Sequence, residues 1–435
     1  MNEKLFTVIA TGDALFTADF PKEYSDGEFI EISDYIKSCD AKLTNLETNL
    51  SDFEFSPNQY SGGTWLNTRR KYFKYLKSYG FDFYGNANNH CLDYGVDGML
   101  STIKTLEDNG VYHAGTGESL EKAQSPAVFT RGGKSVAVFA VDSSFEKPSM
   151  AGVATLSLKG RPGVNYLRHK TAYKIDENDV ANLKKIAEKT RINAERELSI
   201  ATGYKTPDPE GVYVFGDMTF TTDKNTPVTA CDERDLKRLT SLVKDAKSKN
   251  DYVFVLVHCH DDDGISHAVP PEYLTEFSHA LIDSGASAVF GGGCHELRGI
   301  EIYKGLPIFY SLGDFTYQGM RVEILPADFM ESYGLDKNAT AQEALYKRSR
   351  GGKVGLQTQL KNFLTVLPKL SYDGDKMVGF ELAPVKLFFM TGDTREGLPY
   401  IAKGEEAEMI FNKLDALSKP FGTKLKLEKG KIVLS

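Results

Sequence analysis

The 435-residue sequence has no apolar run of about 18 residues, the length that a membrane-spanning helix requires. The start, Met1–Ala10, carries one lysine and an apolar run too short for a signal peptide, so we expect a first β-strand there. No cluster of Lys or Arg stands out, and the net charge is −8, which argues against nucleic acid or an anionic membrane as the main partner. These absences predict a cytoplasmic chain without a membrane span.

The cysteines lack a recognisable spacing. No CxxC pair occurs, which excludes a zinc ribbon and gives no disulfide framework. The odd count fits a reducing compartment. Because free cysteines are usually small buried fillers, we favour that role over metal ligation, although three of them stand beside a histidine. The five are Cys39, Cys91, Cys231, Cys259 and Cys294.

Strand-like apolar runs and helix-like runs alternate over most of the chain. The apolar content of 41% allows a sizeable core, and the length suits one large α/β domain with additions or two domains. Helical spacing ends at a glycine in three places, Gly80, Gly110 and Gly285. This alternation predicts a parallel or mixed sheet with helices on its faces. The expected strands are Leu5–Ala10, Ala41–Thr44, Phe81–Tyr84, Val136–Val141, Tyr252–Val257, Ala288–Phe290 and Pro307–Tyr310.

Two regions depart from the alternation. Asp176–Leu198 reads as one long charged helix, part of an insertion at about residues 165–225 in a core that spans 1–320. After Met320 the pattern loosens, and a strand-like region follows at Leu364–Leu387. Residues 321–435 form either a separate domain or the second sheet of one sandwich, and we prefer the second.

Polar residues gather directly after the strand-like runs. In α/β sheets the carboxyl ends of the strands form the binding crevice, so we expect these side chains around one cavity. Imidazole and carboxylate together suit zinc, manganese or iron, and a carboxylate can bridge two ions. The sequence therefore predicts a site for one or two divalent metal ions. Its predicted ligands are Asp13, Glu47, Asn89, His258 and His295.

Each residue alone also has a structural explanation. Asp13 could cap a turn, and Asn88 and Asn89 tolerate a left-handed turn. Gly291–Gly293 could cradle a phosphate, but a tight turn before His295 is the simpler explanation. The prediction depends on co-occurrence, since four of the eight histidines stand at these strand ends.

Several short motifs stand out along the chain. They are Thr11-Gly12-Asp13, Asn45-Leu46-Glu47-Thr48, Ala87-Asn88-Asn89-His90 with Leu92-Asp93-Tyr94-Gly95, and Tyr310-Ser311-Leu312-Gly313-Asp314-Phe315. These motifs resemble the CapA family, which is linked to poly-γ-glutamate capsule synthesis. The resemblance covers most of the chain and is weakest at about residues 165–225. It implies the four-layer α/β/β/α sandwich of the calcineurin-like metallophosphoesterases.

By this resemblance Asp13 is the first metal aspartate and Glu47 takes the place of the bridging carboxylate. Asn89 and His90 match the family's Asn-His pair, and His258 matches the histidine after the next core strand. His295 matches the last histidine of a Gly-His-His-Pro-His segment.

The chain departs from the family pattern in three places. Gly292 and Gly293 stand where the family has histidines, so one metal would lose a ligand. Asp314 stands where the family has Asn, and His260 is an added histidine. Because residues i and i+2 of a strand point to the same side, we predict that His260 replaces the lost ligand or acts as an acid–base group. Alternatively it begins a loop and points to solvent.

These features predict a metal-dependent, hydrolase-like enzyme. A metal-bound hydroxide would attack a phosphoester or amide-type bond in a small peptide or polyglutamate-like substrate. Peptide epimerisation or isomerisation, by proton abstraction next to a metal-polarised carbonyl, uses the same parts. A non-catalytic partner in capsule polymer synthesis or export is a third possibility. The sequence makes no prediction of oligomeric state.

Candidate residues for catalysis and substrate binding complete the prediction. His90 would protonate the leaving group, and the insertion would cover the cavity. Arg168 would clamp a substrate anion, although a surface ion pair fits it equally well. The predicted catalytic residues are His90, His260 and His295, and the predicted substrate contacts are Arg168, Asn88, Arg298 and Asp314.

Overall fold

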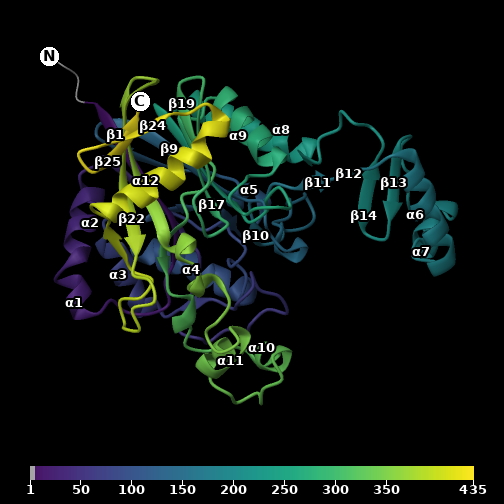
Figure 1. The fold of residues 1–435 in the computed structure, drawn as a ribbon, viewed down its shortest axis with the longest axis horizontal. Helices are drawn as coiled ribbons and strands as arrows, with labels where there is room; N and C mark the ends of the chain where they lie inside the picture. Colours follow the sequence, from purple (N-terminus) through teal and green to yellow (C-terminus); the bar gives the residue numbers. More distant parts are fainter. Residues whose placement is uncertain (1–4) are drawn as a thin grey trace.

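A computed structural model describes residues 5–435 and contains two β-sheets that pack face to face (Figure 1). The larger sheet has ten strands, in the order β24-β25-β22-β21-β1-β2-β5-β6, with β20 beside β1 and β23 beside β22. Strands β1, β2, β5 and β6 run parallel. Its strands are β1 (Phe6–Leu15), β2 (Ala41–Leu46), β5 (Phe83–Gly85), β6 (Tyr112–Ala114), β20 (Asp314–Tyr317), β21 (Leu364–Asp373), β22 (Lys376–Leu387), β23 (Pro399–Ile401), β24 (Leu425–Glu428) and β25 (Lys431–Leu434).

The smaller sheet has six strands in the order β18-β19-β17-β16-β9-β8. Strand β16 lies at its centre and pairs in parallel with both β9 and β17. Every residue of β16 is buried, as expected for a strand covered on both faces. The six strands are β8 (Ala127–Arg131), β9 (Lys134–Asp142), β16 (Tyr252–Cys259), β17 (Ala288–Gly293), β18 (Ile300–Tyr303) and β19 (Leu306–Phe309).

Alternating side chains of each strand divide between the layers. Val8 of β1 packs between the sheets with Phe254 of β16, whereas Ile9 packs against helices α2 and α3 on the outer face. Val255 of β16 packs against α8 and α9 on the other outer face. This α/β/β/α arrangement agrees with the predicted fold class. The helices that cover the sheets are α2 (Glu28–Lys37), α3 (Phe73–Ser78), α4 (Gly95–Asp108), α8 (Glu233–Lys247), α9 (Glu272–Asp283) and α12 (Glu405–Ser418).

The prediction of one helix over Asp176–Leu198 is wrong, because the segment forms two helices, α6 (Glu177–Thr190) and α7 (Ala194–Ala201). Arg191 adopts a left-handed conformation with φ of 56°, which ends α6. Asn193 stabilises the break by donating to the Val214 carbonyl at 2.7 Å. A left-handed arginine carries no sequence signal, unlike a glycine at this position.

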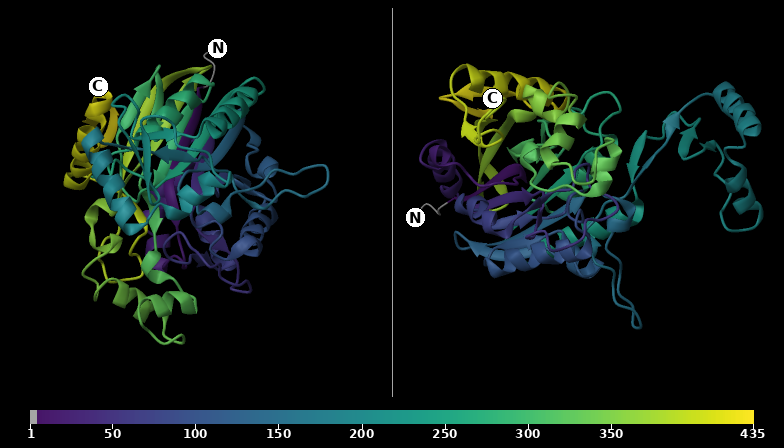
Figure 2. Two further views of the ribbon diagram at one scale, coloured as in Figure 1. Left: turned by 90° about the vertical axis from the view of Figure 1, so that its right-hand side faces the viewer. Right: turned by 90° about the horizontal axis from the view of Figure 1, so that it is seen from below.

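The insertion is an arm that extends away from the body (Figures 1 and 2). Helices α6 and α7 lie beside a small sheet of β12 (Tyr173–Lys174), β13 (Val212–Phe215) and β14 (Met218–Thr221). The arm joins the body through β11 (His169–Thr171), which pairs with β15 (Thr229–Cys231). The arm therefore does not lie over the polar strand ends, where the sequence analysis placed it.

The C-terminal part joins the same sheet as β1, since β21 pairs with β1 along Phe6–Ile9. Before β21, helices α10 (Ala327–Ser332) and α11 (Ala341–Arg348) form a small helical lobe, the green helices at the bottom of Figure 1. Phe329 of this lobe packs with Trp65 and thereby fixes the lobe against the body. The lobe thus contributes to the surroundings of the strand ends.

The sequence predicts free, buried cysteines and no membrane-spanning helix. The five cysteines are all buried and free, in agreement with their predicted role as fillers. Within residues 5–435, no helix has both the length and the apolar character needed to cross a bilayer. The cytoplasmic location stays a prediction.

Candidate metal centre

Asp13 lies inside β1, at an irregularity in the pairing of β1 with β2 and β20. Such a bulge re-aims a side chain. The Asp13 carboxylate accepts hydrogen bonds from Asn45 Nδ2 and from the Gly293 backbone N–H, each at 2.6 Å. Burial tends to raise the pKa of Asp13, but the interaction with His258 and these hydrogen bonds outweigh burial and lower it. Asp13 is thus held as a carboxylate.

Two glycines allow the strands to approach closely around Asp13. A Cβ at Gly12 would lie 1.8 Å from the carbonyl oxygen of Gly313. At Gly292 it would lie 2.5 Å from Asp13 Oδ1. With this backbone, no side chain fits at Gly292, where the family pattern has a histidine.

Glu47 follows β2 and is fully buried. Neither of its carboxylate oxygens has a hydrogen-bond partner among the residues that the structure describes. Burial, together with the neighbouring carboxylates of Asp13 and Asp314, raises the pKa of Glu47 well above its usual value. Since buried polar groups are normally paired, these orphaned oxygens fit a cation that the protein chain itself does not supply.

One set of candidate ligands consists of Glu47, His258 and His260, whose donor atoms lie within 4.8 Å of one another. His258 Nε2 lies 3.7 Å from Glu47 Oε1 and 3.2 Å from His260 Nε2. Asn89 Oδ1 lies 2.8 Å from His258 Nε2 and belongs to the same group of atoms. Burial, followed by the nearby histidines, lowers the pKa of His260 well below its usual value. The neutral ring that results is the form that ligates metals.

A second set consists of Glu47, His295 and Asp314, again within 4.8 Å. His295 Nδ1 lies 3.0 Å from Asp314 Oδ1, and this carboxylate outweighs burial and raises the pKa of His295. His295 has a φ of 60°, a conformation that is uncommon outside glycine and occurs often at functional sites. Glu47 is common to both sets, as expected of a carboxylate that bridges two ions. The mixed nitrogen and oxygen donors fit zinc, manganese or iron.

His90 lies beside this cluster, with Nε2 3.9 Å from Glu47 Oε1. Its Nδ1 lies 2.7 Å from Asp93 Oδ2. Asp93 is held in turn by the backbone N–H groups of Gly62, at 3.0 Å, and Leu66, at 2.7 Å. Asp93 therefore fixes the orientation of the His90 ring and leaves Nε2 for proton transfer.

Sequence reasoning missed the roles of three residues, Asn45, Asp93 and Asp142. Asn45 Nδ2 lies 3.4 Å from His258 Nδ1 in addition to its bond with Asp13. Asp142 ends β9, is fully buried, and has a pKa that burial raises to about 6. Asp142 directly follows the apolar run Val136–Val141, the same signal that indicated the other strand ends.

Three predicted substrate contacts have protein partners in the structure. Arg168 donates from Nε and Nη2 to Asp235, at 2.7 and 3.0 Å. Arg298 is fully buried and donates to the carbonyls of Asp261 and His267, which holds the loop after His260. Asn88 donates to the Leu46 carbonyl at 2.8 Å and accepts from the His90 N–H at 3.2 Å. Substrate contact stays a prediction for these three.

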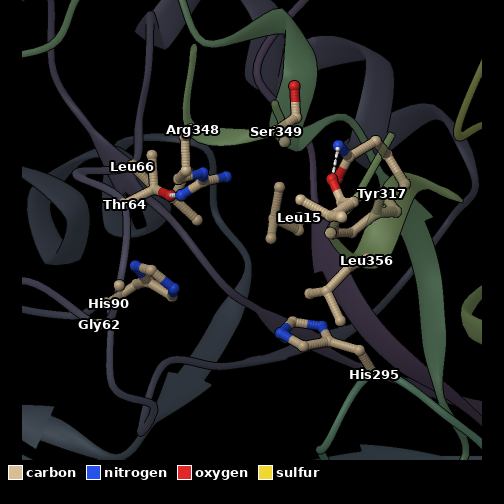
Figure 3. Close-up of a pocket in the computed structure, with 15 residues that line it drawn as sticks. Leu15, Gly62, Thr64, Leu66, His90, His295, Tyr317, Arg348, Ser349 and Leu356 are labelled. Atoms are coloured by element: carbon tan, nitrogen blue, oxygen red, sulfur yellow. Dashed lines mark hydrogen bonds between the residues drawn. The ribbon is translucent and has the colours of Figure 1, made fainter. Parts of the chain in front are cut away.

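A cavity of about 300 Å³ opens next to the cluster and is lined by both His90 and His295 (Figure 3). Its walls come from β1, from the loop 62–66 and from the chain after α11. The cavity therefore opens to the side of the cluster where His90 and His295 lie.

Comparison with known proteins finds relatives along nearly the whole chain. Two proteins of Sinorhizobium fredii, both named only as uncharacterized, are each 30% identical over 434 residues, covering 97% of this chain and 91% of theirs. The PGA biosynthesis protein CapA of Bacillus subtilis is 23% identical over 321 residues, covering 73% of this chain and 63% of that protein. A probable polyglutamine synthesis accessory protein of Mycobacterium tuberculosis is 27% identical over 239 residues, covering 54% and 45% respectively.

A family model, described as bacterial capsule synthesis protein PGA_cap, matches residues 7–318. The matched range includes every residue of the two candidate ligand sets and His90. It ends before α10, so the helical lobe and the C-terminal strands lie outside it. The chain belongs to the PGA_cap family of bacterial capsule synthesis proteins.

Proposed function

We propose that this protein is a metal-dependent hydrolase that cleaves an amide-type or phosphoester bond in a peptide or polyglutamate-like substrate. The observation that carries the proposal is Glu47, a fully buried carboxylate that has no hydrogen-bond partner within residues 5–435 and is common to two sets of candidate ligands. The names of the Bacillus and Mycobacterium relatives, which refer to PGA biosynthesis and polyglutamine synthesis, support a polyglutamate-like substrate.

The residues divide into those that would hold metal and those that would handle substrate. Divalent ions supply positive charge that polarises a carbonyl or phosphoryl oxygen and promotes ionisation of water. His90 is placed to hold a proton at Nε2 for the leaving group, because Asp93 engages Nδ1 and fixes the orientation of the ring. The groups that would hold the ions are Asp13, Glu47, Asn89, His258, His260, His295 and Asp314.

Epimerisation of a peptide is the alternative function, and the position of His260 beside the cluster favours it. His260 is half-buried, and its lowered pKa leaves a neutral imidazole beside the cluster. Where His260 does not ligate a metal, it would be available as the base that removes a Cα proton. Hydrolysis and epimerisation differ in whether the substrate is cleaved.

The test is an assay with manganese or zinc on two substrates, a γ-linked glutamate oligomer and a generic phosphate ester, in water and in D₂O. We expect metal-dependent cleavage of one of them, reduced at least about 100-fold in Glu47→Gln, because losing a group that only supports a metal ligand already costs about 10–100-fold and Glu47 is itself a candidate ligand. Glu296→Gln, which changes a second buried glutamate, is the matched control and should retain activity. Deuterium entering an uncleaved oligomer would favour epimerisation. Absence of turnover with all substrates would contradict the proposal and favour a non-catalytic role in polymer synthesis.

A further inference from the structure

Arg348, in the last turn of α11, lines the cavity beside the candidate metal centre (Figure 3). Its guanidinium donates from Nη1 to the hydroxyl of Thr64, and Cζ lies 5.6 Å from the centre of the Phe329 ring. Thr64 and Phe329 therefore hold the side chain in place. In Figure 3 the Arg348 guanidinium and the rings of His90 and His295 surround the same space.

Among the described residues, Arg348 has no acidic partner. Within residues 5–435, no carboxylate lies within ion-pair distance of its guanidinium, and its one hydrogen-bond partner is the uncharged Thr64. By contrast, Arg69 pairs with Glu323 and Arg168 pairs with Asp235. A half-buried guanidinium with unused donors is suited to bidentate binding of a carboxylate or phosphate.

The rest of the cavity wall explains why this charge matters. Leu15, Leu66, Tyr317 and Leu356 line the walls with largely apolar surface. Ligand sites typically combine such walls with a few polar groups that fix orientation. Glu47 and Asp314 lie next to the cavity-lining His90 and His295, at 3.9 and 3.0 Å, and as carboxylates they would repel an anionic substrate. Arg348 contributes the positive charge on the substrate side.

We propose that Arg348 binds an anionic oxygen group of the substrate, a carboxylate or a phosphate, and positions the neighbouring bond next to His90. This inference depends on the proposed function for what happens to that bond. It assigns substrate recognition to the helical lobe, which lies outside the range that the family model matches.

Trp65 provides a direct readout of binding. It is the single tryptophan of the chain, it follows Thr64 in sequence, and its ring centroid lies 6.4 Å from that of Phe329. Arg348 contacts Thr64, the residue before Trp65, and Phe329, which packs with the Trp65 ring, so an anion at Arg348 should change the fluorescence of Trp65. This measurement does not depend on turnover.

The experiment titrates the full chain with glutarate, with its uncharged isostere glutaramide, and with inorganic phosphate. We expect glutarate or phosphate to change the Trp65 signal, and Arg348→Gln to weaken that binding at least about tenfold. The affinity of Arg348→Lys should lie between those of the wild type and Arg348→Gln, because lysine keeps the positive charge but cannot donate two parallel hydrogen bonds as the guanidinium does. Arg350→Gln is the matched control, because Arg350 is an exposed arginine two residues after Arg348. This variant should bind the anions as the wild type does. Whether glutarate or phosphate binds more tightly tells a carboxylate site from a phosphate site.

Equal affinity in the wild type and both Arg348 variants would overturn the inference, and so would glutaramide binding as tightly as glutarate. Repeating the titration after dialysis against a chelator separates this inference from the proposed function. Anion binding that needs Arg348 in a protein that takes up no metal would uphold Arg348 while contradicting the hydrolase. Metal uptake that requires Glu47, together with unchanged anion binding in Arg348→Gln, would support the metal centre and contradict the role of Arg348. If Arg348→Gln does not fold, the lysine variant alone decides, and wild-type affinity there would overturn bidentate binding.

Discussion

Glu47 and Glu296 are both buried glutamates, but their surroundings are opposite. Glu296 is 2% exposed, and its two carboxylate oxygens pair with Lys361 at 2.9 Å and Lys413 at 3.0 Å. Burial tends to raise its pKa, but the two lysines outweigh burial and lower it. Glu47 is 0% exposed and has a raised pKa, and among the described residues its carboxylate has no hydrogen-bond partner and no lysine or arginine partner, the nearest basic groups being the rings of His258 and His90 at 3.7 and 3.9 Å.

The two glutamates differ in how the charge of a buried carboxylate is compensated. The charge of Glu296 is compensated within the chain, as expected for a group that stabilises the fold. Burial and the neighbouring carboxylates of Asp13 and Asp314 increase the free-energy cost of an ionised Glu47, so its position destabilises the fold. Such an arrangement is typical of functional sites, where a bound ion provides the missing compensation.

The largest expected effect is that of Glu47→Gln, which removes the group shared by both ligand sets. We expect it to abolish binding of both metal ions. We also expect its effect on stability to change sign. In chelator the variant should be more stable than the wild type by about 1–3 kcal/mol, because a buried unpaired carboxylate is removed. With manganese present the wild type should be the more stable, because metal binding stabilises the folded state.

Metal analysis after gel filtration and chemical unfolding with and without chelator would check this prediction. A Glu47→Gln variant that keeps the wild-type metal content, or that is destabilised in chelator as well, would make Glu47 a structural residue like Glu296.

An intermediate effect is expected for His260→Ala, which removes a ligand from one set only. The set of Glu47, His295 and Asp314 keeps all its members. Metal content should therefore fall to about half that of the wild type, or the affinity of one ion should fall roughly 10–100-fold, a size common for loss of a supporting group. Calorimetric titration with zinc resolves the two sites. Unchanged metal binding with a reduced rate would make His260 an acid–base group, and no change in either would place it outside the mechanism.

The smallest effect on the metal is expected for Glu296→Gln. It breaks two ion pairs whose lysines are partly exposed, so we expect a loss of about 1–2 kcal/mol in the free energy of unfolding, discounted for solvent screening. Metal content should equal that of the wild type. Urea unfolding monitored by circular dichroism measures the loss. A fall in metal content would show that the two glutamates are not independent and would weaken the comparison.

Much of the fold and of the candidate centre was predictable because the strands are continuous apolar runs. The end of such a run is easy to locate in the sequence. The polar residue that follows it lies at the carboxyl end of the strand, where α/β sheets form their binding crevice. The sequence therefore predicts that Asp13, Glu47, His258 and His295 lie together. Asp142 carries the same signal, because it directly follows the apolar run Val136–Val141.

What could not be predicted depends on tertiary contacts or on unusual backbone. The break between α6 and α7 arises from the left-handed Arg191, which propensity does not indicate. Arg348 belongs to a helix far along the chain from Glu47, and it reaches the cavity because Phe329 packs on Trp65. The sequence suggests that Arg168 binds a substrate anion, because its protein partner Asp235 lies 67 residues later in the chain, on α8.

The most direct test of the central claim, that Glu47 is shared by two metal ions, is anomalous diffraction from crystals grown with manganese. We predict two anomalous peaks on either side of the Glu47 carboxylate, one beside His258 and His260 and the other beside His295 and Asp314. A single peak beside one set, or no peak within coordination distance of Glu47, would contradict it.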